Sequence, residues 1–292
     1  MSAVDQAAAG AALDAHGYAI LPGALPAAMV AALDRALAPV FAETPFCEGD
    51  FYGARTKRFG RLLARSPLAE QLVRHPAILA MAERALGPWC DTIQLNLTQA
   101  IVIHPGAPAQ FPHRDQDMWR GEIGRTEYLV NVMWPLTPFT ERNGATLIWP
   151  DSHGQAALAG DPDERPVAAN ARPGDAIVFL GSTLHGAGAN RTTAPRRGIL
   201  VSYCLGWLKP YENQWLAYPP DIARTFSRAL ADLVGYRQHR PNLGNYEGQC
   251  PSILLTGDAT RPIAATDALR PDQARLLADY VAGQSAASSR AR

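Results

Sequence analysis

Residues 176–204 read AIVFLGSTLHGAGANRTTAPRRGILVSYC, and this stretch decides the fold class. An apolar run of strand length stands at each end, over residues 176–180 and 198–204. The residues between them carry Gly, Pro and polar side chains and show no helical period. Two strands joined without a crossover helix disfavour a parallel βαβ sheet and favour an antiparallel arrangement.

The same pattern extends through the centre of the chain. Residues 93–98 alternate between apolar and polar side chains, which is typical of a strand with two different faces. Further short apolar runs cover residues 100–103, 128–134 and 146–149, and Gly- and Pro-containing turns separate them. Many short strands with frequent turns predict a mainly β protein built as an antiparallel barrel or sandwich.

Helices are expected on both sides of these strands. Apolar spacing predicts helices over residues 7–16, 29–41 and 68–86, with a short strand at 18–21 and a long loop at 43–65. Residues 221–234 and 272–281 are expected to be helical again, and the last ten residues to be frayed. We therefore expect one domain, with N-terminal helices over about 1–87, a barrel core over about 88–210 and a C-terminal extension over about 211–292.

Composition excludes several classes of protein. Lys+Arg and Asp+Glu both number 27, which argues against a nucleic-acid partner and against a polybasic membrane tether. No apolar run approaches the roughly 18 residues of a membrane span, and the N-terminus lacks the charged region of a signal peptide. The four cysteines lie far apart and are expected to be free thiols. These features predict a cytoplasmic protein with a small-molecule substrate, and they leave a homodimer open.

Two histidines and one carboxylate stand out as candidate metal ligands. His113 and Asp115 are two residues apart, so on an extended segment both side chains face the same way. His185 follows the strand predicted at 176–180. Two histidines and one carboxylate form the facial triad of non-haem Fe(II), which leaves three positions open. The alternative for His113 is an ordinary hydrogen-bonded loop residue.

An arginine pair follows His185 at the start of the next strand. Arg196 and Arg197 are adjacent, so on a strand they point to opposite faces. The face of Arg196 carries Gly198 and Ser202 and leaves room for a small dicarboxylate, so Arg196 is the preferred clamp for a 2-oxo acid and Arg197 the alternative. A solvated surface pair is the other interpretation of both arginines.

Taken together, these motifs resemble the phytanoyl-CoA dioxygenase-like family of Fe(II)/2-oxoglutarate oxygenases. The matching pieces are 113–115 (HRD), 143–146 (NGAT) running into 150–153 (PDSH), and 185–190 (HGAGAN) followed by Arg196 and Tyr203. The resemblance covers roughly residues 10–210. It is closest to the oxygenases of meroterpenoid and alkaloid secondary metabolism. It implies a double-stranded β-helix, also called a jelly-roll or cupin-like barrel.

The resemblance also implies further positions and cofactors. It implies Fe(II) on His113, Asp115 and His185, with 2-oxoglutarate and O2 as cosubstrates. In such relatives the residues that correspond to Gln110 and Thr146 help to bind 2-oxoglutarate; ordinary turn and strand roles are the alternatives here. A filled carboxylate position implies hydroxylation, desaturation or epoxidation rather than halogenation.

The substrate pocket is expected to be aromatic and largely uncharged, which favours a small lipophilic or natural-product-like substrate. Candidate wall residues from the sequence are Phe51, Tyr52, Gln94, Asn96, Thr98, Met118, Trp119 and Trp134. Two other functions remain open at this point. One is a zinc-type metallohydrolase that uses the same three ligands, and the other is a non-catalytic ligand-binding barrel.

Overall fold

The fold consists of two antiparallel sheets, seen in a computed structural model that describes residues 3–162, 164–257 and 262–290. The larger sheet has the order β1-β7-β4-β9-β3-β2 and the smaller one β6-β5-β8. The strands of the larger sheet are β1 (Tyr18–Leu21), β7 (Ala176–Leu180), β4 (Leu129–Pro135), β9 (Arg196–Leu205), β3 (Ile93–Ile103) and β2 (Thr56–Phe59). The smaller sheet holds β6 (Val167–Ala168), β5 (Thr146–Ile148) and β8 (His185–Ala187). The prediction of an antiparallel β architecture is confirmed.

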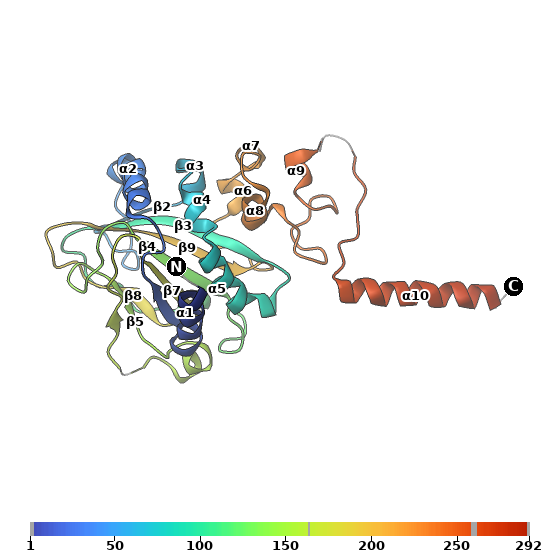
Figure 1. Ribbon diagram of the computed structural model, residues 1–292, viewed down its shortest axis with the longest axis horizontal. Coiled ribbons are helices and arrows are strands. Elements are labelled where there is room, and N and C mark those ends of the chain that lie inside the picture. Colours follow the sequence, from blue (N-terminus) through green and yellow to red (C-terminus); the bar gives the residue numbers. More distant parts are fainter. Residues whose placement is uncertain (1–2, 163, 258–261, 291–292) are drawn as a thin grey trace.

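Helices cover one face of the larger sheet, while β5 and β8 lie on its other side (Figure 1). The N-terminal helices are α1 (Ala3–His16), α2 (Ala27–Glu43), α3 (Leu62–Arg65), α4 (Ala69–Val73) and α5 (Pro76–Leu86). The main hydrophobic core joins Leu33 and Leu37 of α2 to the side chains on the helix face of the sheet. Apolar burial on this face is the main source of stability for such a layer.

Strand β9 alternates between the two faces as its sequence predicts. Ile199, Val201 and Tyr203 belong to the core beneath the helices. Arg196 and Leu200 point the other way, into a cavity between the sheets. A second, smaller hydrophobic cluster takes residues from both sheets, among them Met133, Ile148 and Phe179. Met133 and Phe179 also line the cavity.

The predictions of one continuous helix over 68–86 and over 221–234 are wrong, because each stretch is divided into shorter elements. Pro76 divides the first into α4 and α5, because a proline in a helix interior cannot donate its backbone hydrogen bond and crowds the preceding turn. The second consists of α7 (Pro220–Ala223) and α8 (Arg228–Ala231), followed by the irregular turn η4 (Asp232–Tyr236), in which Gly235 has a φ of 95°.

The predicted loop at 43–65 is also wrong in part, because it contains β2 and α3. Strand β2 pairs with the end of β3 from Ala100 to Ile103. Its sequence, Thr-Lys-Arg-Phe, lacks the apolar alternation that marks a strand. The runs predicted at 93–98 and 100–103 form one strand, β3, with an irregularity in its pairing between Leu95 and Leu97.

The C-terminal part is made of short helices and one long helix. It includes α6 (Gln214–Ala217), α9 (Ile253–Thr256) and α10 (Pro271–Arg290), and short 3-10 turns occur at η1 (Gly87–Trp89), η2 (Asp115–Met118) and η3 (Gly154–Ala159). Helix α10 projects away from the sheets (Figure 1) and is longer than the predicted 272–281. The prediction that the last ten residues are frayed is wrong as far as Arg290, because α10 continues to that residue. Residues 291–292 lie outside the described part. The four cysteines are free thiols.

Within the described ranges, no helix is both long enough and apolar enough to cross a membrane.

Candidate active site

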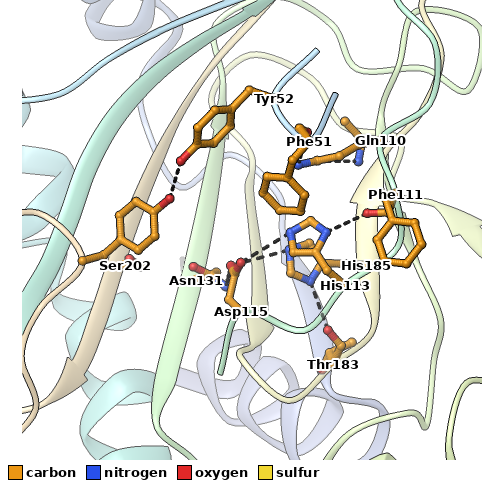
Figure 2. Close-up of polar contacts among 12 residues, drawn as sticks. Phe51, Tyr52, Gln110, Phe111, His113, Asp115, Asn131, Thr183, His185 and Ser202 are labelled. Atoms are coloured by element: carbon orange, nitrogen blue, oxygen red, sulfur yellow. Dashed lines mark hydrogen bonds and ion pairs between the residues drawn. The ribbon is translucent and has the colours of Figure 1, made fainter. Parts of the chain in front are cut away.

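His113, Asp115 and His185 come together at the open end of the space between the sheets. One potential ligand atom from each of them lies within 4.8 Å of the other two. The Nε2 atom of His113 is 3.4 Å from Asp115 Oδ1, and that of His185 is 3.6 Å from Asp115 Oδ2. Figure 2 shows both imidazoles directed at the same carboxylate. The three residues predicted as metal ligands thus form one compact cluster.

The backbone fixes the position of both histidines. His113 and His185 exchange two backbone hydrogen bonds, His113 N to His185 O at 2.9 Å and His185 N to His113 O at 3.0 Å. This isolated antiparallel bridge joins the segment before η2 to the start of β8. Asp115 does not lie on an extended segment, as expected, but is the first residue of the 3-10 turn η2. The turn still directs its carboxylate back toward the two rings.

Each imidazole also contacts a backbone oxygen through its other nitrogen. His113 Nδ1 lies 2.8 Å from Phe111 O, and His185 Nδ1 lies 3.0 Å from Thr183 O. A carbonyl oxygen only accepts, so each Nδ1 must carry the proton and donate it. Nε2 is then the nitrogen that faces Asp115. Burial lowers the pKa of His113, but the hydrogen bond and the charge of Asp115 outweigh it and raise that pKa, so Nε2 donates to the carboxylate while the ring is protonated and offers a lone pair once the ring is neutral. This is the tautomer that metal-ligating histidines adopt, with the second nitrogen oriented by a backbone carbonyl.

Asp115 is held as a carboxylate. Burial alone would raise its pKa, but the imidazoles of His185 and His113 and a hydrogen bond from Asn131 together lower the pKa to about 2. Asn131 Nδ2 donates to Asp115 Oδ2 at 2.9 Å from the middle of β4. This bond sets the direction of the carboxylate, as partners behind metal ligands do.

The cluster opens into a cavity of about 510 Å³ between the two sheets. Its walls are largely apolar and include Ile101, Met133 and Phe179. The loop before β2 closes one side, where Phe51 stacks edge-on against His113 with ring centroids 4.8 Å apart. Tyr52, from the same loop, places its hydroxyl 2.5 Å from the Tyr211 hydroxyl across the cavity mouth.

Arg196 lies in this cavity, and none of the described carboxylates pairs with it. Its side chain is buried, with 1% of the residue exposed, and its guanidinium stacks on Phe139 at 3.8 Å from the ring centroid. Its Nε has no hydrogen-bond partner among the described residues. Burial lowers the pKa of Arg196 to about 9, and the charge of Arg58 adds to the effect. A buried cation of this kind is stabilised by a bound anion.

Arg197 has a different environment on the opposite face of β9. Its Nε and one terminal nitrogen contact the two carboxylate oxygens of Asp34 at 2.8 Å and 2.6 Å. Asp34 belongs to α2, so this pair fastens the helix layer to the sheet. The expected division between the two arginines is therefore seen in their positions, with only Arg196 inside the cavity.

Gln110 and Thr146 also line the cavity. Gln110 accepts a hydrogen bond from Ala187 N and donates one to Phe51 O, both at 3.3 Å, so it links β8 to the loop at the cavity mouth. Thr146 is the first residue of β5 and is buried. Both residues lie on the metal-cluster side of the cavity, and their role in binding a cosubstrate stays a prediction.

Some expected wall residues lie elsewhere. Trp134 is in the helix-side core beside His75, and Trp119 packs against the same core and donates to Lys209 O. Thr98 faces Tyr218 because the irregularity after Leu95 reverses the faces of β3. Gln94 donates to backbone oxygens outside the cavity. Of the expected set, Phe51, Tyr52, Asn96 and Met118 do line the cavity.

Arg58, Asn131 and Tyr211 are among the cavity residues that sequence reasoning missed. Asn131 is the one amide side chain in the run 128–134. An amide is unusual in a buried strand, and this was the available signal. Arg58 lies in the predicted loop at 43–65, and Tyr211 follows the last predicted strand. No strand pattern therefore marked either of them as a cavity residue. His104, by contrast, lies outside the cluster and stacks on Phe46, as a structural residue would.

The fold and the site together define the class of non-haem-metal jelly-roll oxygenases. The sequence model of phytanoyl-CoA dioxygenase (PhyH) matches residues 13–198, and the chain belongs to this family. Among curated relatives, Dioxygenase FrzG of a Cladobotryum species is 34% identical over 216 residues, which is 68% of this chain and 70% of that protein. Dioxygenase trt7 of Aspergillus terreus is 35% identical over 190 residues, or 63% of this chain and 66% of its own length.

Solved structures agree with the assignment of the fold. The non-haem alpha-ketoglutarate-dependent epimerase SnoN superposes with a TM-score of 0.58 at 21% identity, covering 70% of this chain and 85% of SnoN. EctD of S. alaskensis, solved with 2-oxoglutarate and 5-hydroxyectoine, gives a TM-score of 0.57 at 23% identity, with 72% and 79% covered. The predicted double-stranded β-helix is confirmed, and membership of a dioxygenase family makes the chain an oxidoreductase.

Proposed function

We propose that the chain is an Fe(II)/2-oxoglutarate-dependent dioxygenase that oxidises a small, largely apolar, natural-product-like molecule. The observation that carries the proposal is a pairing within one cavity. The two histidines direct both Nε2 atoms at one carboxylate, and a buried arginine in the same cavity has no anionic partner among the described residues. The first suits Fe(II), and the second suits the far carboxylate of a 2-oxo diacid.

The residues present fit both groups. His113, Asp115 and His185 would hold the iron, and Arg196 would hold the distal carboxylate of 2-oxoglutarate. Gln110 and Thr146 line the same cavity and would offer hydrogen bonds to this cosubstrate. Bound Fe(II) would supply the activation of O2 that a protein side chain cannot supply.

The protein itself positions the substrate and excludes water. Phe51 and Phe179 pack against His113 and His185, with ring centroids 4.8 Å and 4.6 Å apart, and shield the metal side of the cavity. Apolar walls keep the substrate carbon near the cluster and keep bulk solvent out. Because Asp115 occupies the carboxylate position, hydroxylation, desaturation or epoxidation is the expected outcome.

The relatives support a natural-product substrate. SnoN and SnoK, which are similar in structure, belong to nogalamycin biosynthesis. A zinc-type hydrolase would leave Arg196 without a use, and a non-catalytic barrel would have no need for the three converging ligand atoms. We therefore prefer the oxygenase to both alternatives.

The first prediction tests the metal cluster. His113→Ala and His185→Ala should each reduce iron content, measured by elemental analysis after anaerobic loading, to a small fraction of the wild-type value, because two ligands hold Fe(II) poorly. His104→Ala is the matched control and should keep its iron, since His104 stacks on Phe46 outside the cluster. Unchanged iron in both ligand variants would show that the cluster is not the metal site.

Cosubstrate binding separates the oxygenase from the alternatives. Anaerobic addition of 2-oxoglutarate to the Fe(II) protein should produce a visible charge-transfer absorption, which a zinc hydrolase or an empty barrel would not give. We also propose a cytoplasmic location, a single domain over residues 1–292 and small-molecule rather than macromolecular partners, and we leave the homodimer as an open prediction. The neutral overall charge supports the choice of partner.

A further inference from the structure

The cavity contains a second arginine, Arg58, which the proposed function does not use. Arg58 lies on β2, opposite Ile101 of β3, and lines the same cavity as the metal cluster. Its neighbours include Tyr52, whose ring centroid lies 4.9 Å from the guanidinium carbon, and Gln99, whose Oε1 accepts from Nη1 at 3.2 Å. Both partners are neutral, so neither balances the positive charge.

Arg58 has no carboxylate partner within the described part of the chain. Its Nε is shielded from solvent and makes no hydrogen bond there. Burial lowers the pKa of Arg58, and Asp115 is the carboxylate among the groups that raise it. Asp115, however, already faces His113 and His185 and belongs to the metal cluster. The other carboxylate that lines the cavity, Asp117, is exposed and forms no ion pair with Arg58 in the described part of the chain, while Arg114, which also lines the cavity, pairs with Asp161 at 2.9 Å.

The charges in the loaded site point to a missing anion. On the proposed function, Fe(II) and Arg196 together carry three positive charges, and Asp115 and the two carboxylates of 2-oxoglutarate together carry three negative charges. The histidines are neutral in the tautomer that their backbone contacts set. Arg114 is paired with Asp161, and Asp117 is exposed to solvent. Arg58 is then one cation in excess within the enclosed part of a largely apolar cavity, where an unpaired charge is costly.

We propose that Arg58 binds a carboxylate carried by the primary substrate, so that the cavity takes an apolar molecule with one acidic group. The proposal rests on the proposed function for its count of charges. Gln99 holds the guanidinium in place, and the hydroxyls of Tyr52 and Tyr211 stand beside it at the cavity mouth. The apolar walls would hold the rest of the molecule against the metal cluster. Arg58 would therefore select substrates by charge as well as by shape.

A matched pair of probes tests the charge preference without turnover. Decanoate, 1-naphthaleneacetate and 1-pyrenebutyrate would each be compared with the corresponding primary amide, by calorimetry on protein loaded with Mn(II) and 2-oxoglutarate under anaerobic conditions. Wild type should bind at least one acid about tenfold more tightly than its amide, the size of one charge-assisted hydrogen bond. If no acid binds more tightly than its amide, the proposal is wrong.

Variants then assign the preference to Arg58. Arg58→Gln should reduce the acid-to-amide ratio to less than about twofold and leave the amide affinity nearly unchanged, while Arg58→Lys should keep part of the ratio. Lys57→Gln is the control, since it removes an equal charge from the next residue of β2, which points away from the cavity toward the Phe41 and Ala42 oxygens. A wild-type ratio in Arg58→Gln would overturn the proposal.

The carboxylate could also belong to the cosubstrate, and a third measurement separates the two sources. The dissociation constant of 2-oxoglutarate should change less than about threefold in Arg58→Gln. A loss as large as that of Arg196→Ala, with the probe ratio intact, would make Arg58 a second cosubstrate clamp and refute the proposal. The acid and amide pairs are repeated without metal and cosubstrate. An Arg58-dependent preference there, with no 2-oxoglutarate binding in wild type, would refute the proposed function while retaining the acid site.

Discussion

The two faces of the larger sheet are built from the same strands, but one face packs in the main hydrophobic core and the other lines the cavity. On the helix side of β9, Ile199, Val201 and Tyr203 are buried in the main core. On the cavity side, Arg196 and Leu200 alternate with them and border open space. The helix face is closed by apolar contact and by the paired Arg197 and Asp34. On the cavity face, the Arg196 guanidinium has no carboxylate partner in the part of the chain that the structure describes. The same strand therefore supports folding on one face and binding on the other.

The sharpest test of this contrast uses the two adjacent arginines. Arg196→Ala should raise the dissociation constant of 2-oxoglutarate by roughly 30- to 1000-fold, because a buried bidentate contact is worth about 2–4 kcal/mol. Arg197→Ala should leave that constant within about threefold and instead lower the free energy of unfolding by about 1 kcal/mol through the lost Asp34 pair. Anaerobic titration and urea unfolding measure the two effects. If the two variants exchange their effects, the assignment of the faces is reversed.

A pair of apolar residues on the same strand sharpens the contrast. Ile199 is fully buried on the helix face, and Ile199→Ala should lower the free energy of unfolding by about 2–5 kcal/mol through the cavity left behind. Iron content should stay unchanged. Leu200→Ala, on the cavity side, should cost about 1 kcal/mol or less, because Leu200 is only partly buried. Equal losses of stability, measured by urea unfolding, would argue against a division of work between the faces.

The metal cluster was predictable because its ligands are marked by local spacing. His113 and Asp115 are two residues apart, and His185 precedes a glycine-rich turn. The cavity-side role of Arg58 was not predictable, because it depends on the pairing of β2 with β3 across some forty residues of chain. Asn131 was missed for a similar reason, since its contact with Asp115 joins two separate segments. Sequence periodicity reports the face of a strand, but it does not report which strand lies beside it.

Breaks within helices were a second feature that the sequence pattern did not predict. The apolar spacing over 68–86 is compatible with one helix, but Pro76 begins a new one, and the spacing carries no information on that break. The irregularity in β3 had the same effect on the predicted walls, because it moved Thr98 to the opposite face. Breaks in an element are set by single residues and by neighbours, and an averaged pattern does not show them.

A pH-dependent effect concerns the carboxyl group of Glu127, just before β4. Burial raises the pKa of Glu127 to about 7, although hydrogen bonds from Ser182 lower it. The folded protein therefore holds this proton more tightly than the unfolded chain, whose Glu pKa is about 4.3. The contribution of Glu127 to stability should fall as pH rises from about 4.3 to 7, because the unfolded state releases the proton first.

Glu127→Gln removes this titration and supplies the measurement. Urea unfolding of wild type and variant at several pH values should show the wild type losing stability relative to the variant across that window. Above about pH 7 the difference should become constant. A difference that does not change with pH would mean that the proton affinity of Glu127 is the same in both states. Iron content should be unaffected in either case, since Glu127 contacts Ser182 and not the cluster.

The bond between the Tyr52 and Tyr211 hydroxyls closes the cavity mouth with two segments that lie outside the central strands. Tyr52 comes from the loop before β2, and Tyr211 comes after β9, beyond residue 198, where the match to the family ends. Neither segment contributes a ligand to the metal cluster. Mutation in these segments can therefore change which molecules enter while the strands that hold the cluster keep their sequence. In evolutionary terms, the entrance is free to diverge faster than the chemistry behind it.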